Sequence, residues 1–275
     1  MKIFVTGATG FIGRHFINEL PQGYEIFANI RNKKQKLIKL NKNIHWINKN
    51  LNLLKSKELK KIDTIIHFAS AGVSPKKATW EELYDFNVNC TLKLLRIAAE
   101  AGVSKIIMAG SYIEYGLSAN KYKFIPPSAN LLPTTPYASS KAAAFELAHG
   151  FCMDAKIHLT YNRIFSAYGD GQYSGNLWPS LYKAATKGDD FLMTSGEQVR
   201  DFIPVKKIAE IFLEDLKFNP KNNLFPIVKN VCSGKGKSIL KFSQYWWKKW
   251  NAKGKLLPGK IPSRKNEPLR FVGKV

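Results

Sequence analysis

The sequence predicts a doubly wound α/β fold, in which a parallel β-sheet carries helices on both faces and a smaller lobe follows. The chain opens with a short apolar run, residues 2–6, that leads directly into a glycine-rich turn over residues 7–13. Short apolar runs then alternate with segments of helical periodicity, which is typical of a parallel sheet buried on both faces. Beyond about residue 166 this alternation stops. We therefore assign residues 1–165 to the sheet domain and residues 166–275 to the smaller lobe, and expect the two to be interleaved.

Length and composition are those of an ordinary globular protein. The 275 residues are 45% hydrophobic, enough for a substantial core in one large domain or two closely packed ones. Three cysteines without paired spacing favour reduced thiols over a disulfide framework or a metal site. The apolar N-terminal segment is too short to span a membrane. We expect a soluble cytoplasmic protein with no bound metal and no integral membrane segment.

The net charge of +23 is large for this length. From Gly234 onward the chain carries twelve lysines and arginines against one acidic residue, Glu267, with three tryptophans nearby. Such a balance can indicate a nucleic-acid partner or an anionic membrane surface. Because the charge is mostly lysine, we interpret it mainly as a solvated surface that attracts anionic substrates, and secondly as a membrane-associated surface. No nucleic-acid partner is predicted.

The first strand and its glycine turn predict a dinucleotide site. Glycines let backbone N–H groups approach a pyrophosphate at the positive end of a helix dipole, and this turn runs into an amphipathic helix that ends near Leu20. The second strand, residues 24–30, lacks the acid that usually holds the ribose of NAD, and Arg31 and Asn32 follow it. This cationic end favours the 2′-phosphate of NADP, with NAD possible. The alternative is that Arg31 belongs to the lysine-rich surface.

Further apolar runs predict the other strands of the sheet. The strand at residues 64–68 leads into Ala69 and Ser70 at the sheet edge that faces a cofactor, where small residues let a ribose approach. We expect His67, near the end of this strand, to be structural. The other predicted strands cover residues 44–47, 105–109 and 157–165, the predicted helices cover residues 80–101, 137–151, 176–187 and 206–216, and a glycine-rich loop covers residues 166–171.

Tyr137 and Lys141 form the candidate catalytic pair. They are four residues apart and therefore share one face of a helix, which Pro133 and Pro136 precede. A fixed ammonium beside a phenol brings the phenol's pKa toward the working pH, so Tyr137 can act as a general acid or base. This spacing also occurs often by chance. Ser111, at the mouth of the strand at residues 105–109, brings a hydroxyl to a position where it could meet a reacting oxygen.

Seven motifs stand along nearly the whole chain. They are TGATGFIG from Thr6, HFAS from His67, Asn87 ahead of a helix, GSYIEYG from Gly110, YASSK from Tyr137, GEQVRDFIPV from Gly196 and NVCSGKGKS from Asn230. In this order and spacing they make the chain resemble the extended short-chain dehydrogenase/reductase family, in its branch of nucleotide-sugar epimerases, dehydratases and reductases. The resemblance implies a Rossmann fold with a substrate-binding lobe, a nucleotide-diphosphate sugar as substrate, and a homodimer built from the helices near residues 80–101 and 138–152.

The resemblance also implies roles for individual residues. In the catalytic triad, Tyr137 exchanges a proton with the sugar oxygen, Lys141 lowers its pKa and binds the nicotinamide ribose, and Ser111 hydrogen-bonds the same sugar oxygen. The implied cofactor-binding residues are Gly7, Thr9, Gly10, Phe11, Ile12, Gly13, Arg31, Asn32, Asn50, Leu51, Phe68, Ala69, Ser70, Tyr137, Lys141 and Ile164. The implied substrate-binding residues are Ser111, Tyr112, Asn176, Leu177 and Arg200, of which Arg200 suits a diphosphate.

Several reactions are known among the proteins that the chain resembles. Dehydratases usually carry acids just after the position of Ser111, but Tyr112 and Ile113 stand there, so dehydration is disfavoured. Epimerases usually keep a tightly bound NAD, whereas Arg31 favours an exchangeable NADPH. The sequence therefore predicts an NADPH-dependent reductase of the C4 ketone of a nucleotide-linked 4-keto-6-deoxy sugar, in the synthesis of surface polysaccharides such as O-antigen. The alternatives are an NAD(P)-dependent nucleotide-sugar 4-epimerase or dehydrogenase, and a non-catalytic NADP-binding regulatory protein.

Overall fold

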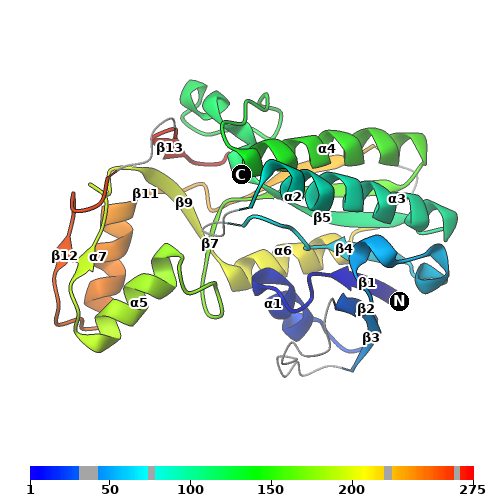
Figure 1. The fold of residues 1–275 in the computed structure, drawn as a ribbon, viewed down its shortest axis with the longest axis horizontal. Coiled ribbons are helices and arrows are strands. Elements are labelled where there is room, and N and C mark those ends of the chain that lie inside the picture. The colour runs from blue at the N-terminus through cyan, green and yellow to red at the C-terminus, as the bar shows by residue number, and fades with distance from the viewer. Residues whose placement is uncertain (31–42, 74–77, 220–224, 263–266) are drawn as a thin grey trace. The chain divides into compact units, whose positions relative to one another are not determined.

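A seven-stranded sheet organises the first part of the structure, with the strand order β10-β6-β5-β4-β1-β2-β3 (Figure 1). The pairings of β1 with β2, β1 with β4, β2 with β3 and β4 with β5 are all parallel. The order reverses between β1 and β4, which is where doubly wound folds open a crevice for a ligand at the carboxyl ends of the strands. The strands are β1 Lys2–Thr6, β2 Glu25–Ile30, β3 Ile44–Asn48, β4 Thr64–His67, β5 Lys105–Ser111, β6 His158–Ile164 and β10 Ile227–Val231.

The computed structural model describes residues 1–30, 43–73, 78–219, 225–262 and 267–275. Within these residues the chain forms two compact units, each assembled from three stretches of sequence. The first unit comprises residues 1–111, 135–163 and 206–229, and the second comprises residues 112–134, 164–205 and 230–275. In the described part of the chain, no helix is both long and apolar enough to cross a membrane.

Apolar side chains fill both faces of the sheet. Phe4, Ile65 and Ile107 are fully buried, and they come from the three neighbouring strands β1, β4 and β5. Helices α2, α3 and α4 cover one face and helices α1 and α6 cover the other (Figure 1). The doubly wound parallel sheet predicted from the sequence is therefore confirmed. The helices are α1 Phe11–Glu19, α2 Trp80–Tyr84, α3 Cys90–Glu100, α4 Pro136–Asp154 and α6 Val205–Lys217.

The helix predicted over residues 80–101 contains an irregular turn. Its first part, α2, begins at a capping box in which Thr79 Oγ1 accepts a hydrogen bond from Glu82 N. A π-helical turn, η3 Asp85–Asn89, separates α2 from α3. Such wide turns accommodate one extra residue and are frequent at functional sites. The buried Asn87 lies in this turn.

Buried polar contacts fix the end of α6 within the first unit. The buried Lys105 Nζ on β5 donates hydrogen bonds to the carbonyl oxygens of Asp215 (2.6 Å) and Leu216 (3.2 Å), which the last turn of a helix leaves unsatisfied. Asp215 in turn accepts hydrogen bonds from Asn162 Nδ2 (2.7 Å) and from Lys229. These contacts connect α6 to strands β5, β6 and β10.

In its described residues, the second unit contains two small sheets, two α-helices and two 3₁₀ turns, η4 Tyr112–Tyr115 and η5 Leu117–Lys121. Strand β9 lies between β11 and β13, and it also pairs with β7. The loop predicted over residues 166–171 was therefore wrong for its first three residues, because Ser166–Tyr168 pair in parallel with β9. The elements are β7 Ser166–Tyr168, α5 Leu177–Lys187, β8 Phe191–Leu192, β9 Val199–Pro204, β11 Gly236–Ser238, α7 Ile239–Lys249, β12 Leu256–Leu257 and β13 Arg270–Phe271.

Candidate active site

The glycine turn after β1 is shaped by close backbone contacts. Gly7 has a φ of +68°, and a Cβ at this position would lie 2.8 Å from Ala69 N on the neighbouring strand end. A Cβ at Gly13 would overlap the Gly7 carbonyl oxygen. That oxygen also accepts a hydrogen bond from Gly10 N at 2.8 Å. Only glycine fits at Gly7 and Gly13, so no side chain at these two positions covers the backbone of the turn.

The N-terminus of α1 is open to an anion. Gly10 is the N-cap, and in the described chain no side chain caps the helix and no acid lies in its first turn. The first N–H groups of a helix have no intrahelical partner and attract negative charge. A bare turn followed by this helix end fits the pyrophosphate of a dinucleotide. The predicted cofactor residues Gly7, Thr9, Gly10, Phe11, Ile12 and Gly13 are thus contiguous along the turn and the first turn of α1.

A chain of hydrogen bonds runs through the buried His67. Thr91 Oγ1 donates to the Asn87 carbonyl oxygen at 2.7 Å, so the same hydroxyl accepts from His67 Nε2 at 3.3 Å. His67 Nδ1 is then an acceptor, and it receives the hydroxyl proton of Thr6 at 2.7 Å. Thr6 Oγ1 accepts from Ala69 N at 3.2 Å. These contacts require the neutral tautomer with its proton on Nε2.

Burial and a neighbouring cation keep His67 neutral. Burial first, and the charge of Lys141 second, lower the pKa of His67 from 6.5 to about 3. An imidazole with this pKa is neutral throughout the physiological range and makes a poor acid there. The structural role predicted for His67 agrees with these contacts.

Asn87 joins the end of β4 to the start of α4. Its Oδ1 accepts hydrogen bonds from Ala71 N (2.8 Å) and Ser70 Oγ (3.1 Å). Its Nδ2 donates to Ser140 Oγ at 2.9 Å and to the Ala71 carbonyl oxygen at 3.3 Å. Ser140 Oγ donates onward to the Tyr137 carbonyl oxygen at 2.9 Å. One buried amide therefore fixes both the predicted ribose-facing Ser70 and the backbone of Tyr137.

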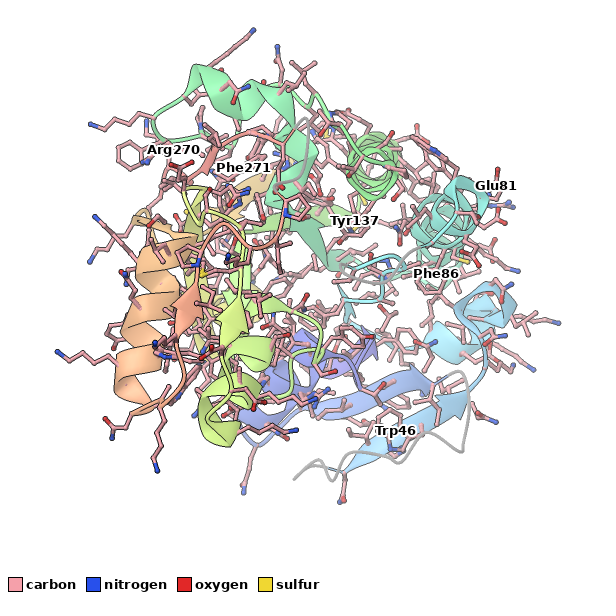
Figure 2. All side chains as sticks on the ribbon, turned by 60° about the vertical axis from the view of Figure 1, so that its left-hand side comes forward. Trp46, Glu81, Phe86, Tyr137, Arg270 and Phe271 are labelled. Atoms are coloured by element: carbon pink, nitrogen blue, oxygen red, sulfur yellow. The ribbon has the colours of Figure 1, made fainter. Side chains whose placement is uncertain are left out.

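The three predicted catalytic residues all belong to the first unit. Ser111 is the last residue of β5. Tyr137 and Lys141 lie in the first two turns of α4, and Thr135 is the N-cap of this helix. Tyr137 is labelled in Figure 2. Lys141 is buried, and its Nζ donates a hydrogen bond to the carbonyl oxygen of Ala109 at 2.8 Å. Ala109 lies two residues before Ser111 on the same strand. Lys141 is therefore held at the carboxyl end of β5, whereas the Tyr137 ring is half-buried.

The remaining predicted cofactor residues are divided between the two units. Asn50 is exposed and is the N-cap of a 3₁₀ turn, η1 Leu51–Leu53, in which Leu51 is buried. Phe68 follows β4, and its ring contacts those of Phe16 on α1 and Phe212 on α6. Ile164, the last residue of β6, belongs to the second unit. Arg31 and Asn32 lie outside the described residues.

Arg200 is the cation of the second unit that sequence reasoning assigned to a diphosphate. It is 5% exposed, and its Nη2 donates to Glu267 Oε1 at 2.7 Å. Its Nη1 donates to the carbonyl oxygens of Val199 (2.9 Å) and Leu269 (3.1 Å). The guanidinium also lies over the Phe271 ring, 5.2 Å from its centroid. The guanidinium group of Arg200 is thus held by two backbone carbonyl oxygens, one carboxylate and the face of one aromatic ring.

The other predicted substrate residues of the second unit lie at the N-terminus of α5 and in an aromatic cluster. Asn176 is the N-cap of α5, and Leu177 is its first residue. The ring of Tyr112 stacks on Phe165 with centroids 5.2 Å apart and meets the edge of Phe271 at 4.9 Å. Tyr112 therefore packs in an aromatic cluster that also includes the ring beneath Arg200.

The sequence profile of the NAD dependent epimerase/dehydratase family matches residues 3–226. This chain belongs to that family. The match contains the glycine turn and the Tyr137–Lys141 pair, and it confirms the resemblance found in the sequence.

Individual relatives of this family member catalyse different reactions. Human dTDP-D-glucose 4,6-dehydratase is 28% identical over 246 residues, which cover 83% of this chain and 69% of the relative. The dTDP-6-deoxy-L-talose 4-dehydrogenase (NAD(+)) of Aggregatibacter actinomycetemcomitans is 24% identical over 285 residues, with 99% of each chain covered. Among solved structures, MoeE5 in complex with UDP-glucuronic acid and NAD superposes with a TM-score of 0.88 at 26% identity, covering all of this chain and 90% of MoeE5.

The sequence assigned no role to two buried residues, Asn87 and Asp201, whose hydrogen bonds hold neighbouring segments in position. Asn87 was noted only as part of a motif, and its contacts reach residues 16 to 53 positions away. Asp201 is fully buried beside Arg200, and its carboxylate accepts hydrogen bonds from Ser233 N (2.7 Å), Ser233 Oγ (2.6 Å) and Gly234 N (2.9 Å). It thereby fixes β9 to the residues that precede β11. The signal for Asp201 was its place inside the GEQVRDFIPV motif.

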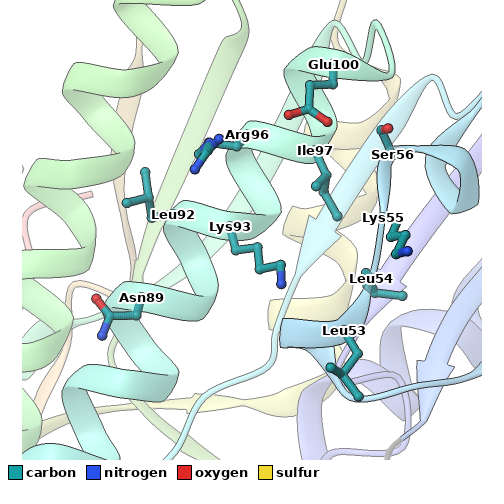
Figure 3. A pocket seen from close by; sticks show the side chains of 10 residues that line it. All are labelled: Leu53, Leu54, Lys55, Ser56, Asn89, Leu92, Lys93, Arg96, Ile97 and Glu100. Atoms are coloured by element: carbon teal, nitrogen blue, oxygen red, sulfur yellow. The ribbon is translucent and has the colours of Figure 1, made fainter.

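A separate cavity of about 660 Å³ lies along α3 (Figure 3). None of the residues that line it was predicted for the cofactor or the substrate. Its walls are the outer side of α3 and the segment that includes η1. In the described residues there is also no cluster of three or more side chains suited to a metal ion. The residues that line the cavity are Leu53, Leu54, Lys55, Ser56, Asn89, Leu92, Lys93, Arg96, Ile97 and Glu100.

Proposed function

We propose that this family member reduces the C4 ketone of a nucleotide-linked 4-keto-6-deoxy sugar with NADPH. In this proposal residues 1–165 hold the cofactor and residues 166–275 hold most of the substrate. The observation that carries the proposal is the anchoring of Lys141 at the end of β5, one helical turn after Tyr137. Ser111 ends the same strand, so the Lys141 ammonium lies near the end of β5 that carries Ser111, and Tyr137 comes one turn earlier on α4.

The first unit has the parts that a nicotinamide dinucleotide requires. Its pyrophosphate would rest on the bare turn at Gly7 and Gly10, and its ribose would meet Ser70 and Lys141. When bound, NADPH supplies a hydride for the carbonyl carbon. The fixed positions of Asn87 and Lys141 keep these binding groups in place before ligands arrive, which lowers the entropic cost of orienting them.

Tyr137 supplies the proton for the reduction. As the C4 carbonyl becomes an alkoxide, its oxygen takes the phenolic proton of Tyr137 and accepts a hydrogen bond from Ser111. The buried Lys141 ammonium stabilises the phenolate that is left, because opposite charges attract strongly where water is excluded. The phenolate then regains a proton from solvent.

The second unit supplies the group that binds the diphosphate. Arg200 presents a planar fork that suits phosphate oxygens, and a diphosphate would share or replace its contact with Glu267. Asn176 and Leu177 lie at the N-terminus of α5, where backbone N–H groups also favour an anion. We assign these three residues to the nucleotide end of the substrate.

Two features support a redox reaction at C4 over dehydration. Tyr112 packs against aromatic rings where dehydratases carry an acid, so no acid at that position is available for eliminating water. The 4-dehydrogenase that matches 99% of this chain acts at the same sugar carbon. The choice of NADPH rests on Arg31 and Asn32, which follow β2. A 4-epimerase with bound NAD is the second candidate, since epimerases give the family its name.

A substrate panel tests the reaction. The purified protein is mixed with 4-keto-6-deoxy sugars linked to dTDP, CDP, GDP or UDP, and the nicotinamide absorbance is followed with NADPH and with NADH. We expect oxidation of NADPH with at least one of these sugars and slower oxidation of NADH. Cofactor that stays bound through purification, together with no net oxidation for any sugar, would favour the epimerase. A clear preference for NADH would overturn the role given to Arg31 and Asn32.

Replacement of the proton donor gives the sharpest test of catalysis. Tyr137→Phe removes the phenolic proton, and we expect kcat to fall about 1,000-fold with little change in NADPH binding. Tyr84→Phe is the matched control, because Tyr84 loses only a hydroxyl that is 2.9 Å from Ser139 Oγ on the same helix α4. Unchanged function of the Tyr137→Phe variant would instead favour a non-catalytic NADP-binding regulatory protein.

Assembly and cellular location complete the proposal. We propose a cytoplasmic homodimer in which α2, α3 and α4 of two copies pack together. Trp80 on α2 and Met153 on α4 are large apolar side chains that are 51% and 40% exposed. Light scattering of the purified protein should give twice the mass of 31.1 kDa. Trp80→Lys should shift this value toward the monomer.

A further inference from the structure

The second unit carries a strongly basic face for which the proposed reaction has no use. Residues 234–260 contain eight lysines and no aspartate or glutamate. Five exposed positions on α7 follow one another at intervals of three or one, so they share one side of the helix. They are Lys241, Gln244, Tyr245, Lys248 and Lys249. Together with Lys237 we call this set the lysine face.

The opposite side of α7 fixes the helix to the second unit. Phe242 is buried and stacks on Phe202 with ring centroids 3.8 Å apart. Trp247 packs in a cluster with Leu181 of α5, and its Nε1 donates to the Gly254 carbonyl oxygen at 2.8 Å. The helix is therefore held from within, and the lysine face is directed to solvent. Side chains tipped with nitrogen project from this helix in Figure 2.

Two lysines of this face, Lys237 and Lys249, contact aromatic rings. Lys237 Nζ lies 5.0 Å from the centroid of Tyr245, and Lys249 Nζ lies 4.8 Å from that of Trp246. Among the described residues, no carboxylate forms an ion pair with a lysine of this face. Cation–π contacts leave the positive charge in place, so the face keeps its full charge toward solvent.

We propose that the lysine face is a docking surface for an acidic phospholipid bilayer. Lysine is a compact, hydrated charge on a long stem, which suits a diffuse layer of lipid phosphates, and an exposed tyrosine beside it suits the headgroup region. Tyr245 is 52% exposed at the centre of this face. The face thus combines the two side-chain types that interfacial helices use.

The aromatic geometry favours a bilayer over single-stranded nucleic acid. Nucleic-acid sites need ring faces on which bases can stack. Here Trp246 stacks on Trp250 at 5.0 Å, and Lys249 lies over the Trp246 ring. The lysine face also contains no arginine, the side chain that best reads bases and phosphates through its fork. Adsorption through this face is independent of the proposed reaction.

Vesicle sedimentation of the whole protein tests this proposal. Vesicles of phosphatidylcholine are compared with vesicles in which about one third of the lipid is phosphatidylglycerol. We expect binding to the acidic vesicles alone, and weaker binding as salt screens the charges. The triple variant Lys241→Ser, Lys248→Ser, Lys249→Ser should lower the partition coefficient about 100-fold, because each lysine near an acidic surface contributes about fivefold.

A second triple variant controls for net charge. Lys57→Ser, Lys60→Ser, Lys217→Ser removes the same charge from exposed positions of the first unit and should lower partitioning by less than about tenfold. Equal losses in both triple variants, or no binding to acidic vesicles, would overturn the proposal. Tighter binding to a single-stranded uridine polymer than to acidic vesicles, lost in the α7 variant, would replace the bilayer with nucleic acid.

Discussion

Each unit buries one cation to which the sequence assigned a binding role, and the two cations are held in different ways. Lys141 of the first unit is 4% exposed and donates to a backbone carbonyl at the end of β5, and its charge lowers the pKa of His67. Arg200 of the second unit is 5% exposed and pairs with the carboxylate of Glu267. The first cation therefore acts on its neighbours through its electrostatic field, whereas the charge of the second is balanced by Glu267. In the proposed function, this difference gives the first unit fixed geometry and gives the second unit a contact that a diphosphate would replace.

The largest expected effect comes from filling the bare turn of the first unit. Gly7→Ala forces a side chain into a left-handed conformation and against Ala69 N, and should cost about 4 kcal/mol of unfolding free energy and abolish NADPH binding. Gly102→Ala is the matched control. Gly102 has a φ of +77°, but apart from the glycine and its chain neighbours no atom of the described residues lies within 4 Å of the place that a Cβ would take, so only about 1 kcal/mol should be lost. Urea unfolding of both variants measures the difference, and equal losses would mean that the contact with Ala69 has no effect.

Removing the amide that joins β4 to α4 should have the next largest effect. Asn87→Leu leaves Ala71 N and Ser140 Oγ without their buried partner and should cost about 3 kcal/mol of unfolding free energy. Because Tyr137 loses its indirect support, kcat should fall about tenfold while the KM for the sugar changes little. Asn89→Leu, two residues later, removes only an exposed contact with Asp85 and should cost less than about 1 kcal/mol. A change in KM alone for Asn87→Leu would contradict a positioning role.

The buried histidine predicts a specific acid sensitivity. Its pKa is about 3 in the folded protein and 6.5 in the unfolded chain, so between these values the unfolded state binds more protons. Stability is therefore complete above pH 6.5 and decreases as the pH falls toward 3. Between pH 7.5 and pH 5 this single group should remove about 2 kcal/mol of unfolding free energy. Urea unfolding at both pH values measures this loss, and a His67→Gln variant should lose about 2 kcal/mol less than the unmodified protein between the two pH values. An equal loss of unfolding free energy in the variant would rule out His67 as the cause.

A substitution of Arg200, the buried cation of the second unit, should give the smallest effect. Arg200→Lys keeps the charge but loses the planar fork, and should raise the KM for the nucleotide sugar about tenfold with kcat nearly unchanged. Arg270→Lys is the control, since the exposed contact of Arg270 Nε with the Lys123 carbonyl oxygen lies outside the pair with Glu267. Steady-state kinetics separate the two parameters. A fall in kcat alone for Arg200→Lys would place this arginine among the fixed groups and remove the difference between the two units.

Much of the first unit follows from short-range sequence patterns. The glycine turn and the spacing of Tyr137 and Lys141 could be recognised in the sequence, because each pattern is contained in one short stretch of chain. Asn87 could not be understood in this way, since its partners come from a distant loop and another helix. The pairing of Ser166–Tyr168 with β9 was missed because the glycines after it suggested a loop, while the pairing itself depends on residues 36 positions later.

The π-helical turn η3 has a consequence for how this chain can vary in length. Because this wide turn accommodates one extra residue, removing Val88 would leave a regular α-helix with the faces of α2 and α3 nearly aligned, but would change the position of Asn87 within the turn. Asn87 would then leave Ser70 and Ser140, although every other side chain of the helix was kept. Single-residue deletions should therefore be tolerated far less at residues 85–89 than substitutions on the exposed side of the same helix.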